Sequence, residues 1–290
     1  MGGPVDFCIR FSGLTIRFSF PAPLEIPEAL DALRCEDTDT PDAHYQIVLI
    51  HHPLRPTEPL YHEEQGVSIY QTEKGWLRIY SGIMDTDGCQ VACLFSPDGR
   101  HTLYCPASRW LRFYSGNAIV TFLCGELLLL QHNALLLHSS LVMLHGKAIL
   151  FCGPSGAGKS TQAQLWEQHL GAQILNGDRT VVMKRSDGFY GGGSLWSGTS
   201  GIYRSEQAPI AGIFLVGQAP ETTIRPLGFD AFVPLYSQTI LNSWDPAFMS
   251  RISGLFSDLL AQVPIYRLNC LPDEGAVKAA YDTLFGNTPL

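Results

Sequence analysis

A glycine-rich octapeptide between an apolar run and a helical run constrains the fold of this chain more than any other segment. Residues 147–152 (Lys-Ala-Ile-Leu-Phe-Cys) have the composition of a buried strand, and residues 160–170 have the spacing of an amphipathic helix. The octapeptide between them, Gly-Pro-Ser-Gly-Ala-Gly-Lys-Ser, matches the Walker A pattern G-x-x-x-x-G-K-[ST]. In this pattern backbone N–H groups surround phosphate oxygens at a helix N-terminus, where the helix dipole favours anions. We therefore predict a nucleoside triphosphate as ligand.

The residues of this loop have expected tasks. Lys159 reaches the β and γ phosphates, and the hydroxyl of Ser160 is a candidate ligand of Mg²⁺. The predicted nucleotide-binding residues run from the first glycine of the loop into the helix: Gly153, Pro154, Ser155, Gly156, Ala157, Gly158, Lys159, Ser160 and Thr161.

A second apolar run, residues 172–176, ends at Gly177-Asp178-Arg179 and is predicted to be the next strand. A strand, helix, strand unit of this length implies two parallel strands, and ligands gather at the carboxyl ends of such strands. Asp178 is therefore expected to face the phosphates, where it would hold magnesium or accept a proton from an attacking hydroxyl. The alternative is an aspartate that only opens a turn.

Upstream of the loop, His145-Gly146 separates two apolar runs, which predicts a hairpin with a two-residue turn. That register sets Leu144 opposite Lys147 and His138 opposite Gly153. An imidazole beside the phosphate loop could bond a phosphate, orient Asp178 or shuttle a proton. His138 could equally be a core histidine with satisfied hydrogen bonds.

At these segments the chain resembles the HPr kinase/phosphorylase superfamily, whose kinase core shares its phosphate-loop architecture with phosphoenolpyruvate carboxykinase. The matching segments are residues 137–140 (Leu-His-Ser-Ser), 153–160 and 176–179 (Asn-Gly-Asp-Arg). In that family a histidine stands ahead of the strand that feeds the loop, and the strand after the loop ends in two aspartates followed by arginine. One of those aspartates is the base toward the substrate serine. The resemblance implies ATP and Mg²⁺ as cofactors, with His138, Lys159 and Asp178 as catalytic residues.

The chain departs from the family pattern at one position of this motif. Asp178 matches the second aspartate, and Gly177 stands in place of the first. Either Asp178 carries both duties, or His138 takes the proton, or turnover is weak or absent.

The resemblance covers roughly residues 134–285 and is closer to the HPr kinase-like proteins of peptide biosynthesis than to HPr kinase itself. Residues 193–198 (Gly-Ser-Leu-Trp-Ser-Gly) and 205–220 carry this closer similarity. Some of those relatives phosphorylate a serine of a lasso-peptide precursor. The resemblance therefore implies a serine of a peptide or protein as the acceptor.

Further charged side chains are candidates for contacting phosphate or substrate. A guanidinium group suits oxyanions, and a carboxylate can orient a substrate or hold a metal ion. The candidates are Arg179, Arg204, Arg225 and Glu206. The alternative for each arginine is a surface ion pair.

Composition excludes several classes of protein. The net charge of −8 and the absence of clustered lysine and arginine argue against a nucleic-acid binder. The most apolar stretch, residues 118–144, is interrupted by Glu126, Gln131 and His132, so we expect a buried helix and strand rather than a membrane span. No secretory signal opens the sequence, and the eight cysteines form no C-x-x-C pair, which indicates reduced thiols in the cytoplasm.

Before residue 115 the pattern is mostly β, with alternating apolar residues on both sides of Ser12-Gly13 and similar pairs of runs around residues 73–75 and 97–99. We predict a mostly β N-terminal domain (1–115), a connecting helix (116–134) and an α/β P-loop kinase core of the HPr kinase/phosphoenolpyruvate carboxykinase type, with a mixed sheet and helices (135–290). The β domain could receive an extended peptide as an added strand, or it could serve packing or formation of a homo-oligomer.

The sequence thus predicts a kinase that transfers the γ-phosphoryl group of ATP to a hydroxyl, with a peptide or protein serine as acceptor. Two rival classes stay open. One is a kinase of a small hydroxyl compound, and the other is a nucleotide-dependent binding module with weak catalysis or none.

Overall fold

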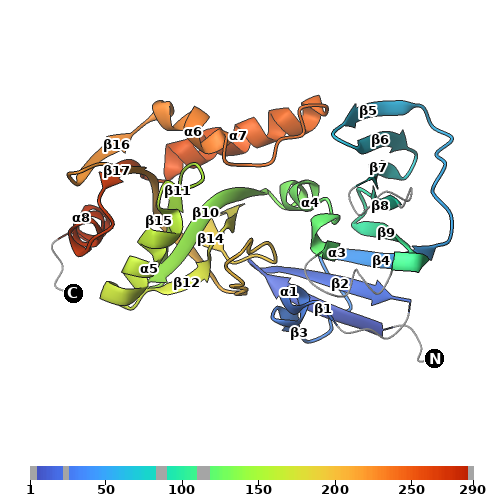
Figure 1. Cartoon of the computed structure of the whole chain (residues 1–290), viewed down its shortest axis with the longest axis horizontal. Helices are drawn as coiled ribbons and strands as arrows, with labels where there is room; N and C mark the ends of the chain where they lie inside the picture. Colours follow the sequence, from blue (N-terminus) through green and yellow to red (C-terminus); the bar gives the residue numbers. More distant parts are fainter. Residues whose placement is uncertain (1–4, 22–25, 83–89, 110–117, 287–290) are drawn as a thin grey trace. The chain divides into compact units, whose positions relative to one another are not determined.

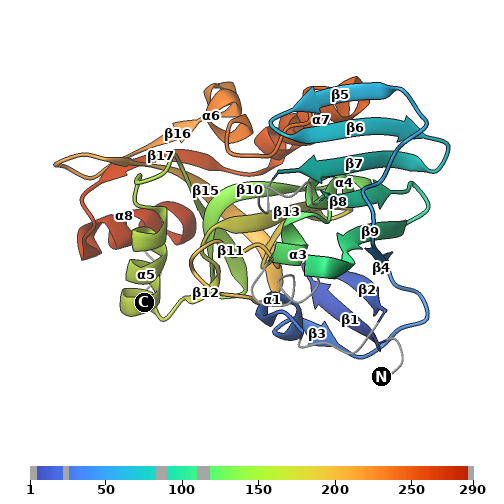
Figure 2. The same cartoon turned by 45° about the vertical axis from the view of Figure 1, so that its right-hand side comes forward.

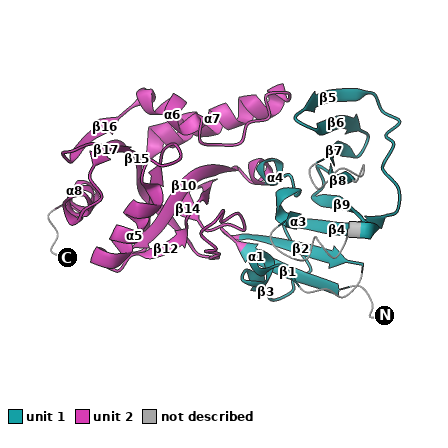
Figure 3. Ribbon diagram, viewed as in Figure 1, with its two compact units in different colours: residues 1–10, 14–128 teal, residues 11–13, 129–290 magenta. Residues whose placement is uncertain are grey.

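The chain divides into two compact units, each with its own large mixed sheet. The structure, a computed structural model, describes residues 5–21, 26–82, 90–109 and 118–286. Residues 1–10 and 14–128 form unit 1, and residues 11–13 and 129–290 form unit 2 (Figure 3). The chain is therefore a mixed α/β protein, and the main division falls inside the segment 116–134.

Unit 1 is built on a nine-stranded sheet with the order β3-β1-β2-β4-β9-β8-β7-β6-β5 (Figure 2). Its strands are β1 (Val5–Phe11), β2 (Leu14–Phe20), β3 (Arg34–Cys35), β4 (Ala43–Ile50), β5 (Leu60–Glu64), β6 (Val67–Thr72), β7 (Gly75–Ser81), β8 (Gln90–Phe95) and β9 (Arg100–Pro106). Alternating apolar residues give the sheet an aromatic core, in which Phe7, Phe18, Phe20 and Tyr45 stack on one another.

The sheet of unit 1 contains more than the predicted hairpins. The hairpins β6–β7 and β8–β9 are present, and Ser12 and Gly13 turn the chain between β1 and β2 with φ of 50° and 81°. In addition, β2 pairs with β4 and β4 pairs with β9, both in parallel. Parallel neighbours need a long crossover, and the connection from β2 to β4 contains α1 (Glu28–Asp31) and β3.

The single connecting helix expected over residues 116–134 is not formed. The described part of that segment holds two short helices, α3 (Ala118–Thr121) and α4 (Gly125–Gln131), and β10 already begins at Ala134. Cys124 has a φ of 50°, in the left-handed region that a right-handed helix cannot contain. The apolar pattern predicted a buried segment, but it does not reveal this break.

Unit 2 is built on an eight-stranded sheet in which each of two long strands pairs with different strands along its length. Its strands are β10 (Ala134–Leu144), β11 (Lys147–Cys152), β12 (Gln173–Asn176), β13 (Arg179–Arg185), β14 (Gly188–Gly192), β15 (Gln207–Gln218), β16 (Thr223–Leu227) and β17 (Ile265–Cys270). The first part of β10 pairs with β13, and its second part pairs with β11 and β12. In the same way β15 pairs first with β14 and then with β11 and β17.

Strand directions bring several carboxyl ends to one edge of this sheet. The hairpin β10–β11 has the predicted register, with Leu144 opposite Lys147 and Ser139 opposite Cys152. Because β11 and β12 are both antiparallel to β10, they run in the same direction, with β10 inserted between them. β15 is parallel to β11, and β17 is parallel to β15. The predicted strand, helix, strand unit is therefore present, although its two strands are not neighbours.

Helices α5 and α8 pack against the sheet of unit 2. The helices of unit 2 after β10 are α5 (Lys159–Leu170), α6 (Phe232–Tyr236), α7 (Pro246–Gln262) and α8 (Glu274–Phe285) (Figure 1), with the 3₁₀ turn η2 (Phe229–Ala231). Unit 1 has a further 3₁₀ turn, η1 (Ala107–Arg109). Trp166 of α5 and Tyr281 of α8 belong to the same buried cluster as Phe151 of β11 and Phe214 of β15. No helix in the described ranges is long and apolar enough to cross a membrane.

Candidate functional site

The phosphate-loop sequence connects the buried strand β11 to α5. Gly158 is the N-cap of α5 and has a φ of 103°, a conformation that residues with a side chain rarely adopt. The first N–H groups of a helix have no carbonyl partner within the helix, so this end of α5 can bind an anion. Ser160 and Thr161 are exposed in the first turn, as contact with phosphate or Mg²⁺ requires.

Lys159 is folded into the loop that precedes it. Its Nζ donates hydrogen bonds to the carbonyl oxygens of Gly153 and Pro154 at 3.0 and 3.1 Å, and the residue is buried. Burial lowers the pKa of the amine, and the positive charge of Arg179 lowers it further, while Asp178 raises it. The charges of Lys159, Arg179 and Asp178 therefore influence one another.

The carboxylate of Asp178 lies between an imidazole and a guanidinium group. His138 Nε2 is 3.3 Å from Asp178 Oδ1, and Arg179 Nε is 3.4 Å from Asp178 Oδ2. All three side chains are partly exposed, at 26%, 31% and 34% for His138, Asp178 and Arg179, so a ligand can reach them. His138 and Arg179 are also register partners on β10 and β13.

The imidazole of His138 is held in its neutral form. Burial lowers its pKa below 6.5, and the positive charges of Lys159 and Arg179 lower it further, whereas Asp178 opposes the shift. At neutral pH the ring therefore has a nitrogen free of a proton. His138 and Asp178 together form a pair that can accept a proton at this edge of the sheet.

The turn that presents Asp178 is organised by a buried amide that the sequence analysis did not single out as functional. Asn176 is fully buried, and its Oδ1 accepts hydrogen bonds from the backbone N–H groups of Asp178 and Arg179 at 2.8 and 2.7 Å. Its Nδ2 donates to Ser194 Oγ at 3.2 Å, and that hydroxyl donates to the carbonyl of Arg179 at 2.6 Å. The dipeptide Asn-Gly before Asp178 is a turn signal that could have identified this role.

The segment after β14 packs closely against this turn. A Cβ atom at Gly177 would lie 2.5 Å from Ser200 Cβ, and one at Gly198 would lie 2.6 Å from Asp178 Cγ. Real Cβ atoms do not approach other atoms so closely. An aspartate at position 177, as in the family pattern, would therefore not fit unless Ser200 moved.

The structure does not bring the other charged candidates to the same place. Arg225 lies on β16 and pairs with Asp230 at 3.3 Å, with both side chains more than half exposed. Glu206 is exposed and accepts a hydrogen bond from Gln173 at 3.4 Å. Arg204 is exposed in the chain before β15. Of the four candidates, only Arg179 contacts Asp178 in the described structure.

The residues present suit a magnesium ion that is held mainly by phosphate. Among the described residues there is no group of three or more His, Cys, Asp or Glu side chains that could bind a metal alone. Mg²⁺ is usually bound by one or two protein ligands, substrate phosphates and water. The exposed hydroxyl of Ser160 and the accessible carboxylate of Asp178 fit that arrangement.

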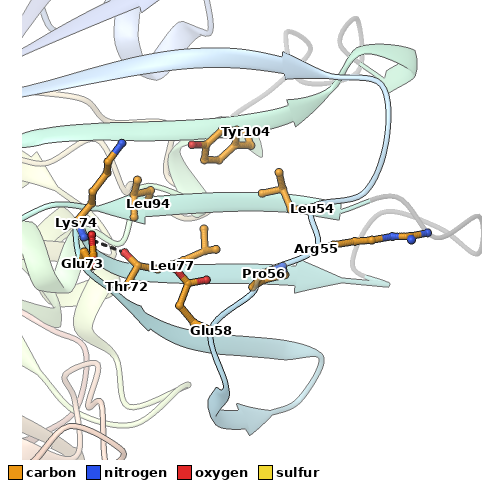
Figure 4. A pocket seen from close by; sticks show the side chains of 10 residues that line it. All are labelled: Leu54, Arg55, Pro56, Glu58, Thr72, Glu73, Lys74, Leu77, Leu94 and Tyr104. Carbon is orange, nitrogen blue, oxygen red and sulfur yellow. Dashed lines mark hydrogen bonds between the residues drawn. The ribbon is translucent and has the colours of Figure 1, made fainter.

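Unit 1 contains cavities of its own, which none of the predicted site residues line. One, of about 460 Å³, is lined by ten residues that include Leu77 and Tyr104 with the charged Arg55, Glu58 and Lys74 (Figure 4). Its walls mix both signs of charge, and the described contacts there give no arrangement of acid, base and phosphate loop like that of unit 2.

Comparisons with known proteins add little to this geometry. No family model matches the chain, and no curated protein matches it. Among solved structures, the Hpr(Ser) kinase/phosphatase from Coxiella burnetii is similar with a TM-score of 0.29 and 12% sequence identity, over 52% of this chain and 88% of that chain. A likeness at this level does not show the function of this chain.

Proposed function

We propose that this chain is an ATP- and Mg²⁺-dependent kinase of the HPr kinase-like type that transfers the γ-phosphoryl group to a serine hydroxyl of a peptide or protein. The observation that carries the proposal is the cluster of His138, Asp178 and Arg179, whose charges interact with that of Lys159. A phosphate loop alone would support nucleotide binding. A proton-accepting pair beside it supports transfer to a hydroxyl.

In the proposed reaction the acceptor oxygen attacks the γ-phosphorus while the bond from that phosphorus to the β,γ-bridging oxygen breaks, so that ADP leaves. The hydroxyl proton passes to Asp178, and the neutral His138 at 3.3 Å shares it. Lys159 leaves its carbonyl partners for the β and γ phosphates, where it meets opposite charge, and Arg179 offsets charge near the transferred group. When bound, Mg²⁺ neutralises phosphate charge, and Ser160 and Asp178 are the residues that would hold it.

Two substitutions separate binding from transfer. Lys159→Ala should lose nucleotide affinity and transfer together, whereas Asp178→Asn should keep nucleotide affinity and lose transfer by about 10²- to 10⁴-fold. ATP binding measured by calorimetry and phosphorylated product measured by mass spectrometry give the two readouts. Lys147→Ala and Asp187→Asn are matched controls, because Lys147 is exposed at the start of β11 and Asp187 lies in the β13–β14 turn. Intact transfer by Asp178→Asn would remove Asp178 from the mechanism.

A second candidate is a nucleotide-dependent binding module without chemistry. It is favoured by one observation, that Ser200 fills the room which the missing aspartate at position 177 would need. Such a protein would bind ATP and a partner, and it would yield no phosphorylated product with any peptide or small hydroxyl compound. Phosphorylation of a small compound alone would instead identify a small-molecule kinase.

A further inference from the structure

A small cavity opens on the phosphate loop without any residue of the His138–Asp178–Arg179 cluster in its wall. Its volume is about 240 Å³, which is less than the roughly 300 Å³ or more of a pocket for a complete drug-sized ligand. Gly156–Gly158 of the loop and the first turn of α5 form one wall. The carboxyl ends of β15 and β17 form the other, with Val216, Cys270 and Leu271 among the lining residues. The cavity therefore suits one part of a ligand whose remainder lies on the loop.

The inner wall of this cavity holds a buried polar side chain with an unused acceptor. Gln162 is 2% exposed, and its Oε1 has no hydrogen-bond partner in the described structure. Its Nε2 donates to Cys270 Sγ at 3.3 Å, and a thiol is a weak acceptor. This oxygen is itself enclosed, so the amide of Gln162 has to turn toward the cavity to meet a donor. Because a buried unpaired carbonyl oxygen is unfavourable in a folded protein, a ligand that satisfies it would gain affinity.

One side of the cavity is apolar. Leu271 is 49% exposed, and Pro272 follows it in the chain and also lines the cavity. A flat aromatic ring would find an apolar face at Leu271 and a polar edge at Gln162. Guanine has two neighbouring hydrogen-bond donors on one edge, which a carboxylate would accept. No lining residue is an aspartate or glutamate, so the described wall offers guanine no such carboxylate.

We propose that this cavity binds the base of the nucleotide and that Gln162 selects adenine over guanine. A primary amide supplies one acceptor and one donor, the complement of the amino group and ring nitrogen of adenine. With the base in this cavity and the triphosphate on the loop, the γ-phosphate would lie toward Lys159. The inference rests on the proposed function, because it assigns the base of the same phosphoryl donor.

The test compares three probes, namely ATP, GTP and inorganic tripolyphosphate, by their dissociation constants in calorimetry. Wild-type protein should bind ATP about tenfold or more tightly than GTP and tripolyphosphate, and Gln162→Leu should abolish most of that preference while leaving tripolyphosphate unchanged. Unchanged tripolyphosphate affinity also shows that the variant is folded. Gln164→Leu is the matched control, because Gln164 is exposed on the same helix.

A second variant tests the direction of the preference. The carboxylate of Gln162→Glu offers two acceptors and no donor, so ATP affinity should fall relative to GTP affinity. This variant carries the test if Gln162→Leu does not fold.

The experiment distinguishes failure of the base-site assignment from failure of the kinase proposal. Equal binding of ATP and GTP by the wild type, or equal loss of ATP and tripolyphosphate affinity in Gln162→Leu, would overturn the assignment of the cavity. Loss of selectivity in Gln162→Leu together with no transfer to any acceptor would keep the base site and overturn only the kinase proposal. No binding of any probe would overturn both.

Discussion

His138 stands between one acidic and two basic side chains, and their balance sets what its imidazole can do. Asp178 would keep the ring protonated, but burial together with Lys159 and Arg179 outweighs it and lowers the pKa below 6.5. A histidine can accept a proton only when its ring is neutral at the working pH. The same positive charges that suit a phosphate therefore also keep the ring neutral.

This balance predicts the pH dependence of transfer. Because the pKa of His138 is lowered, the ring is mostly neutral at pH 7 and above, and transfer should change little with its titration there. As pH falls through the lowered pKa, the ring takes up a proton and kcat/KM should decrease. His138→Asn should reduce kcat/KM and remove this acid limb, and His169→Asn, an exposed histidine of α5, should leave both unchanged. A pH profile between about 5 and 8 makes the measurement, and an unaltered limb in His138→Asn would contradict the assignment.

At the scale of elements, the site depends on the turn between β12 and β13 and on the segment that packs against it. Asn176 fixes the backbone of Asp178 and Arg179, and Gly198 allows that segment to approach the Asp178 carboxylate. Neither residue is expected to touch ATP. Both would act by positioning Asp178.

Two glycines of this segment provide a matched pair of substitutions. Gly198 and Gly201 have similar φ values of 56° and 62°, but a Cβ atom would meet Asp178 at Gly198 and would meet nothing within 4 Å at Gly201. Gly198→Ala should therefore displace the carboxylate and reduce kcat by about 10²-fold, while ATP affinity stays unchanged. Gly201→Ala carries similar backbone strain and should keep kcat. Equal effects of the two substitutions would show that strain, and not contact with Asp178, is responsible.

The sequence predicted local features of these elements well. A two-residue turn fixes the register of its hairpin, so the position of His138 near the end of β11 could be derived from His145-Gly146 alone. The insertion of β10 between β11 and β12 could not, because it depends on pairing between segments far apart in the chain. The same holds for the approach of Gly198 to Asp178 and for Gln162 to Cys270, since no local pattern encodes these contacts.

At the scale of the whole molecule, the described contacts of the candidate site come from one unit. The loop, the proton-accepting pair, the turn at Asn176 and the cavity at Gln162 all belong to unit 2. The sheet of unit 1 ends at β3 on one side and at β5 on the other, and such edges can accept an extended peptide. Acceptor recognition by unit 1 stays a proposal. Transfer itself should depend on residues of unit 2.

The most direct test of the central claim is intact-mass spectrometry of candidate peptides and small hydroxyl compounds after incubation with the full chain, ATP and Mg²⁺. The proposed function predicts a gain of about 80 mass units on a serine peptide, the mass of one phosphoryl group, and none with Lys159→Ala. ATP binding by the wild type without a mass gain on any acceptor would contradict the kinase and favour the binding module.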